Sequence, residues 1–75
     1  MKYYKSIGGM VHAEDVWMEI CNLAVMTFEL NISGLEYFQW RIETGMIKET
    51  KDPIDILKAR SLENEYREFK RNDES

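Results

Sequence analysis

The sequence predicts an all-α protein, a single domain of three helices spanning about residues 13–30, 34–44 and 53–71. Three observations favour this class. Residues 13–30 are apolar around most of a helical wheel. Ser33 stands where a helix cap is expected. Asp52-Pro53 is a typical helix start, with a cap followed by proline at the first helical position.

Length and composition predict a small protein that needs a second chain for stability. A chain of 75 residues buries only about 60% of the surface that its unfolded form exposes. Cys21 is the only cysteine, so an internal disulfide is excluded, and one histidine without paired cysteines disfavours a metal site. Oligomerisation is the stabiliser that is left, and we expect a homodimer in which the first or second helix supplies the interface.

The charge balance disfavours whole classes of partner. A net charge of −4 argues against binding nucleic acid by charge or binding an anionic membrane surface. No apolar run approaches the length of a membrane span, and the first ten residues lack the hydrophobic core of a signal peptide. We therefore expect a cytoplasmic protein with no membrane partner.

Residues 1–12 form an arm or a short strand in this interpretation. Tyr3, Tyr4 and Ile7 are apolar enough to pack against the domain, and Gly8-Gly9 interrupts the segment.

The first helix, about 13–30, is unusually hydrophobic. Its apolar residues cover an arc of roughly 220°, against the ~100° of an ordinary surface helix. We expect Trp17 and Phe28 in the core together with Phe38 of the next helix. Cys21 lies on the same apolar side and is interpreted as a buried thiol.

The second helix, about 34–44, has two apolar faces. Ser33 and Glu36 fit a capping box, and Gly45 suits the left-handed position after a helix end. One face can pack on the first helix. The opposite face, with Tyr37 and Trp40, contacts either a partner or the third helix of the same chain.

The third helix, about 53–71, carries a narrow apolar stripe on a surface of mixed charge. The stripe consists of Ala59, Leu62, Tyr66 and Phe69. Residues 72–75 are expected to fray.

One constellation resembles a catalytic or metal site. His12, Asp15 and Glu19 have the spacing i, i+3, i+7, which places them on one helical face. A metal-dependent enzyme is a hypothesis that would depend on these three residues. The sequence supplies no nucleophile and no oxyanion site beside them, and we predict no catalytic residue, no metal and no cofactor.

A second pattern, running from residue 27 to residue 45, has a leucine, a turn residue, an isoleucine and a capping serine in order. This run resembles the helix-turn-helix motif of DNA-binding regulators, and a transcriptional regulator is the alternative function. The sequence departs from the motif at Thr27, Asn31 and Tyr37, where a small residue, a glycine and a small aliphatic residue are usual. The expected recognition surface holds no lysine or arginine and includes Glu36.

The leading hypothesis is a small acidic, non-enzymatic protein that binds a larger protein and inhibits or modulates it. Eight acidic and three basic residues lie between Glu14 and Asp52. Such a surface can imitate the phosphates of DNA, as a phage-type inhibitor of a DNA-handling protein would. The residues expected to contact the partner are Tyr37, Trp40, Arg41, Asp15, Glu19, Glu36 and Glu43.

Overall fold

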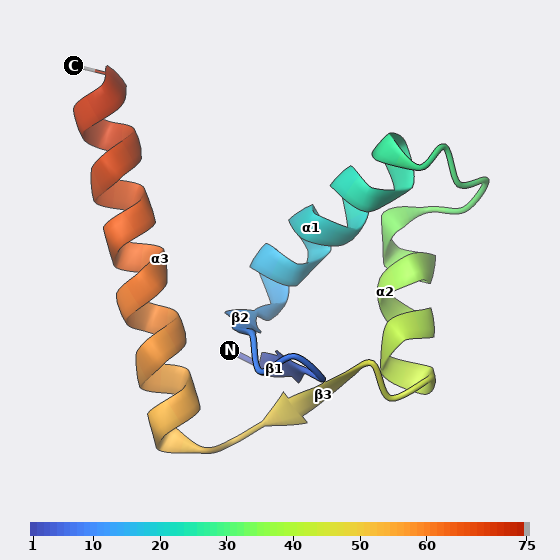
Figure 1. Ribbon diagram of the computed structural model, residues 1–75, viewed down its shortest axis with the longest axis horizontal. Coiled ribbons are helices and arrows are strands. Elements are labelled where there is room, and N and C mark those ends of the chain that lie inside the picture. The colour runs from blue at the N-terminus through green and yellow to red at the C-terminus, as the bar shows by residue number, and fades with distance from the viewer. Residues whose placement is uncertain (75) are drawn as a thin grey trace.

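The chain folds into three helices and a three-stranded antiparallel sheet. The computed structural model describes residues 1–74, with side chains as far as Phe69. The elements in chain order are β1 (Tyr3–Ser6), β2 (Val11–Ala13), α1 (Glu14–Thr27), α2 (Gly34–Glu43), β3 (Ile47–Thr50) and α3 (Pro53–Glu74) (Figure 1). The all-α prediction is therefore wrong, and the fold is a mixture of helices and sheet.

The sheet has the order β2-β1-β3, with β1 in the centre. Residues 7–10 close the β1–β2 hairpin, where Gly9 adopts a φ of 90° that favours glycine. Tyr3 faces Ala13 of β2 on one side and Thr50 of β3 on the other, so the sheet joins the first residues to a segment far along the chain. The N-terminal segment, predicted as an arm or one short strand, thus supplies two strands, the second of which includes Ala13, and the predicted connection before α3 supplies the third.

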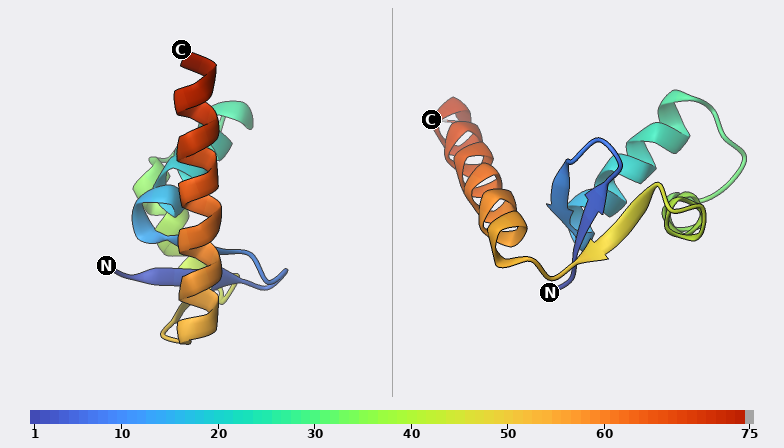
Figure 2. Two further views of the ribbon diagram at one scale, coloured as in Figure 1. Left: turned by 90° about the vertical axis from the view of Figure 1, so that its left-hand side faces the viewer. Right: turned by 60° about the horizontal axis from the view of Figure 1, so that its bottom comes forward.

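Helices cover both faces of the sheet (Figure 2). On one face, a cluster beneath α1 and α2 comprises Tyr4, Trp17, Cys21, Phe38 and Ile47. On the other face, a cluster beneath α3 comprises Tyr3, Val11, Ala13 and Ala59. Because neighbouring strand residues point to opposite faces, Tyr3 and Tyr4 are both buried, each in a different cluster.

Hydrogen bonds and ring contacts fix α1 and α2 on their face of the sheet. Trp17 donates from Nε1 to the carbonyl oxygen of Tyr4 at 2.9 Å. The Tyr4 ring meets Phe38 edge-on with centroids 5.3 Å apart. Cys21 is fully buried, as predicted, and burial raises the pKa of its thiol.

The helix ends follow the predicted signals more closely in α2 and α3 than in α1. The Ser33 hydroxyl accepts from the backbone N–H of Glu36 at 3.1 Å, and Gly45 has a φ of 77°. The helix α1 stops at Thr27, three residues before its predicted end, and Phe28 is 70% exposed rather than in the core. The helix α3 continues to Glu74, beyond the predicted end at 71, and Ser75 lies outside the described residues.

The protein exposes more surface than a compact monomer of its size. Its radius of gyration is 13.5 Å, against about 11 Å expected for a compact domain of this length. Its accessible surface is 5924 Å², whereas a folded monomer of 9.0 kDa exposes about 4,900 Å². The excess is about 1,000 Å², and exposed apolar side chains on α1 and α3 contribute to it.

Candidate functional site

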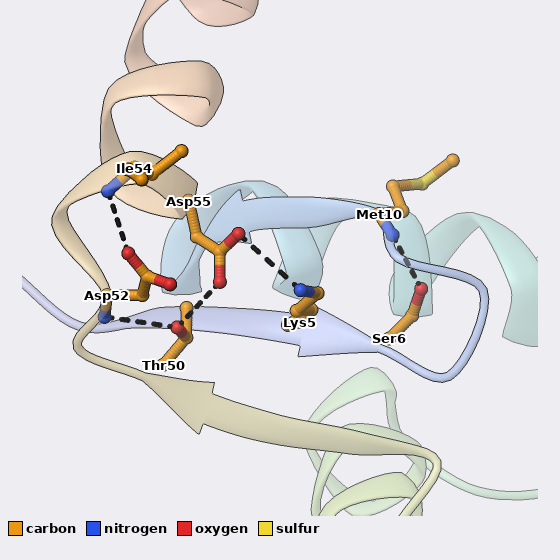
Figure 3. Close-up of polar contacts among 7 residues, drawn as sticks. All are labelled: Lys5, Ser6, Met10, Thr50, Asp52, Ile54 and Asp55. Carbon is orange, nitrogen blue, oxygen red and sulfur yellow. Dashed lines mark hydrogen bonds and ion pairs between the residues drawn. The ribbon is translucent and has the colours of Figure 1, made fainter.

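The first turn of α3 is tied to the sheet by a group of polar contacts (Figure 3). Asp52 caps the helix by accepting from the backbone N–H of Ile54 at 2.9 Å. Asp55 accepts from the hydroxyl of Thr50 at 3.1 Å and lies 3.5 Å from the ammonium group of Lys5. The start of α3 is therefore held by both β1 and β3.

Two more contacts hold the next two turns of α3. The Arg60 guanidinium donates from Nε to the hydroxyl of Tyr3 at 3.2 Å. A carboxylate oxygen of Glu63 accepts from the backbone N–H of Ala13 at 3.3 Å. Ala59, one residue before Arg60, is fully buried in the cluster with Tyr3 and Ala13. The rest of α3 extends past the sheet and diverges from α1 towards its C-terminus (Figure 1).

A groove lies between α1 and α3, and we call it the α1–α3 groove. Its volume is about 500 Å³. Its walls come from β2, α1 and α3, and its lining residues are His12, Asp15, Val16, Glu19, Ile20, Leu23, Leu62, Glu63, Tyr66 and Arg67. The lining is mainly apolar and includes charged side chains, and this combination is typical of a surface that binds another chain.

His12 forms part of the groove where β2 joins α1. Its ring meets Trp17 edge-on with centroids 5.1 Å apart, and its Nδ1 atom is buried without a hydrogen-bond partner. Burial lowers the pKa of His12, an effect that the nearby Glu63 carboxylate partly opposes. The lowered pKa favours the neutral imidazole, which contributes an uncharged aromatic ring to the wall.

The three residues of the predicted metal or acid–base constellation do line one groove. His12, Asp15 and Glu19 all contribute to its wall. Within the described part of the chain, however, no three His, Cys, Asp or Glu side chains are placed to hold a metal ion. The arrangement offers two carboxylates beside an apolar channel, which suits the binding of a basic or amphipathic segment.

A second exposed surface lies on α2, and we call it the α2 outer face. It consists of Glu36, Trp40 and Glu43, whose spacing of four and three residues places them on one side of the helix. Trp40 is 49% exposed and meets Tyr37 edge-on with centroids 5.9 Å apart. The helix α3 covers the opposite face of the sheet, so it does not shield Trp40 as one of our sequence-based alternatives supposed (Figure 2).

Arg41, the only basic residue between positions 14 and 43, is turned into the protein. Its guanidinium carbon lies 5.6 Å from the centroid of the Trp17 ring and 5.7 Å from that of Tyr37. Both are cation–π contacts, and its Nε atom is buried. The six acidic residues of the same segment are all exposed. The exposed charges of the α1–α2 layer are consequently all negative.

The structure divides the predicted partner-binding residues into three groups. Asp15 and Glu19 line the α1–α3 groove. Three more form the α2 outer face. Tyr37 packs against the core, and Arg41 contacts the two aromatic rings instead of a partner.

The α3 wall of the groove was missed from the sequence as a binding surface. It contains Leu62, Glu63, Tyr66 and Arg67. The apolar stripe on the third helix was recognised, but no binding role was assigned to it. The length of the stripe was the signal that could have indicated a binding surface, because the stripe is longer than strands of three or four residues can cover.

The connection between α1 and α2 also bears on the helix-turn-helix resemblance. It runs from residue 28 to residue 33, which is longer than the three or four residues usual in that motif. The exposed side of α2 presents carboxylates, which would repel DNA phosphates. The geometry gives this alternative no added support.

Comparisons with protein-family models, with curated proteins and with solved structures give no match to this chain. Among the described residues, no helix combines the length and the apolar character that crossing a bilayer requires. The case for a function therefore depends on the two surfaces.

Proposed function

We propose that this protein is a small acidic interaction protein, without catalysis of its own, that binds a basic surface on a larger protein and inhibits it. A DNA-binding surface is the kind of target that we favour. The observation that carries the proposal is the uniformly negative exposed charge of the α1–α2 layer, in which the only arginine faces inwards.

The α2 outer face combines the two properties that such binding needs. Its carboxylates supply long-range attraction to a basic partner, which raises the association rate and selects against acidic partners. Trp40 supplies a large, partly exposed aromatic group of the type that dominates interface energetics. Carboxylates on either side of an aromatic anchor also resemble the alternation of phosphate and base that a DNA-binding surface recognises.

The test is affinity capture from a cell lysate with matched baits. The disrupting bait carries Glu36→Lys and Glu43→Lys. The control bait carries Glu29→Lys and Glu49→Lys, which change the net charge equally but lie outside both the α2 outer face and the α1–α3 groove. We expect one partner to be retained by the wild type and the control and lost from the disrupting bait, with retention that falls as salt rises.

Two further measurements define the kind of target. Duplex DNA added to the captured complex should release the partner, because both compete for one basic surface. A Trp40→Ala bait should weaken retention without changing its dependence on salt, since the substitution removes no charge. The proposal would be contradicted if the wild type retained no partner at low salt. It would also be contradicted if the disrupting and control baits lost the partner equally. A gel shift of duplex DNA by the protein itself would favour the regulator alternative.

A further inference from the structure

Exposed apolar side chains on the two walls of the α1–α3 groove form part of the surplus exposed surface of the chain. Leu62 on α3 is 57% exposed, and Leu23 on α1 is also exposed. The whole chain exposes about 1,000 Å² more than a compact monomer of its mass. A standard protein interface removes about 800 Å² from each partner. One partner of ordinary size in the groove would bring the exposed surface close to the expected value.

The groove cannot be closed by its own α3 without breaking contacts that hold the helix. Arg60 and Glu63 fix α3 on Tyr3 and Ala13 of the sheet. A rotation of α3 towards α1 would separate these pairs and would uncover Ala59, which is fully buried. The apolar walls are therefore more readily covered by a second chain.

The spacing of the wall residues fits a helix as that second chain. On α1, Val16, Ile20 and Leu23 follow a spacing of four and three residues. On α3, Leu62 and Tyr66 line the groove, and the exposed Phe69 continues their stripe by three residues. Alternation of three and four is the pattern of a helix that packs along another helix.

The charges along the groove fit an α3 helix from a second copy of this chain. Asp15 and Glu19 line the α1 wall, and Arg67 lines the α3 wall. An incoming α3 brings the same apolar stripe together with its own Arg67, which can lie against the carboxylates of the α1 that receives it. A two-fold axis makes the exchange mutual, so that each copy buries the same surfaces.

We propose that two copies of this chain form a symmetric dimer in which residues 62–69 of each α3 occupy the α1–α3 groove of the other. The pair forms a four-helix layer of two α1 and two α3 helices. The contact uses a different surface from the α2 outer face, so the dimer and the proposed function can fail separately.

The first test measures molar mass by light scattering over a dilution series. We expect the wild type to approach twice its mass of 9.0 kDa at concentrations of micromolar and above. Leu62→Glu should leave a 9.0 kDa monomer, because it places a charge in the groove. Leu57→Glu is the matched control on the same helix, since Leu57 is 66% exposed but does not line the groove, and this variant should remain a dimer.

The second test shows whether the contact joins two chains. In a homodimer of the Arg67→Glu variant, the new carboxylate of each copy lies against Glu19 of the other copy. In a homodimer of the Glu19→Lys variant, the new ammonium group of each copy lies against the Arg67 guanidinium of the other copy. Each variant alone should therefore dimerise about tenfold more weakly than the wild type, because two symmetric ion pairs are replaced by repulsion. An equimolar mixture of the two variants should recover dimerisation. In the mixed dimer one contact keeps the original pair of charges and the other joins the two substituted side chains, which also have opposite charges.

Circular dichroism of each variant shows that the helices are intact, and the charge variants remain informative if Leu62→Glu fails to fold. The proposal would be overturned if the wild type stayed at 9.0 kDa up to about 100 µM. The groove would then be covered by its own chain or by a different protein, and not by a second copy. Equal behaviour of Leu62→Glu and Leu57→Glu, or no recovery in the mixture, would also overturn it.

Discussion

Replacing Ile47 tests the corrected fold most directly, because an all-α domain would leave this residue in a connection. In the structure Ile47 is fully buried in β3 and packs in the cluster with Trp17 and Phe38. Ile47→Ala removes three carbon groups at about 0.8 kcal/mol each and leaves a cavity as well. The expected loss in the free energy of unfolding is about 3–4 kcal/mol.

That loss is a large share of the total stability. A domain of this length is stabilised by about 4–11 kcal/mol, so Ile47→Ala should leave a marginally folded protein. Ile47→Val removes one methyl group and should cost about 1 kcal/mol, which keeps the effect measurable if the alanine variant unfolds.

The assay is urea denaturation at about 25 °C, followed by circular dichroism and by tryptophan fluorescence, to which the buried Trp17 and the half-exposed Trp40 both contribute. All variants are compared at one protein concentration, because the dissociation of a dimer would contribute to the measured free energy of unfolding. Ile7→Ala is the control, since Ile7 lies in the β1–β2 turn with 80% of its surface exposed, and it should cost less than about 0.5 kcal/mol. If Ile47→Ala cost no more than Ile7→Ala, β3 would not belong to the core and the sheet would be wrong.

Three other predictions concern single sites. Burial lowers the pKa of His12 in the folded protein, so the unfolded chain, with the ordinary value of 6.5, binds the proton more tightly. The difference in pKa therefore makes its full contribution to the free energy of unfolding above about pH 6.5. This contribution falls as the pH drops towards the lowered pKa. Urea midpoints at about pH 7.5 and about pH 5.5 should therefore differ more in the wild type than in His12→Gln, and equal differences would refute the prediction. A Cβ at Gly34 would overlap the Asn22 side chain and approach its Cα to 3.1 Å, so Gly34→Ala should destabilise the protein by about 1 kcal/mol. In an Asn22→Ala background this cost should shrink by at least about 0.5 kcal/mol in urea unfolding, and additive costs would show that the two sites do not touch. Burial also raises the pKa of the Cys21 thiol, so a thiol reagent should react slowly with the native protein and quickly in urea, whereas Met26→Cys, at an exposed position outside the α1–α3 groove, in a Cys21→Ser background should react quickly in both.

Local signals in the sequence located the helices because each signal acts within a few residues. The Ser33 cap and the left-handed Gly45 bound α2 where they were expected, and Asp52 caps α3. The end of α1 was misplaced because its apolar pattern continues past Thr27, where the helix stops. Glu29 there adopts a φ of 52°, which turns the chain towards α2.

The sheet could not be derived by the same reasoning. Its strands have three or four residues, and both faces of β1 are buried, so Tyr3 and Tyr4 show no alternation of apolar and polar residues. The pairing of Tyr3 with Thr50 joins the first strand to the last, and no local pattern reports such a contact. Once the sheet is present, it provides the extra surface on which α3 packs.

The candidate site was predicted in part for a related reason. The acidic residues of α1 and α2 were identified from composition, and they are exposed as expected. Their division between two surfaces depends on which side of the sheet α3 occupies. The inward orientation of Arg41 depends on the aromatic rings of Trp17 and Tyr37. Both features depend on tertiary structure, and together they make the exposed charge of the α1–α2 layer more negative than the sequence alone suggests.

The two proposed surfaces have a joint consequence, because α1 lies between α2 and the groove (Figure 1). A dimer formed through the groove would leave both α2 outer faces exposed, and it would present two negative surfaces to one extended basic target. Binding of the second face would then be intramolecular, with a gain in apparent affinity that monomers cannot have. The monomeric Leu62→Glu variant should therefore bind a captured partner more weakly than the wild type when that partner offers two sites, and equally well when it offers one. Charge reversal of the α2 outer face should abolish binding in both cases, which separates the role of each surface.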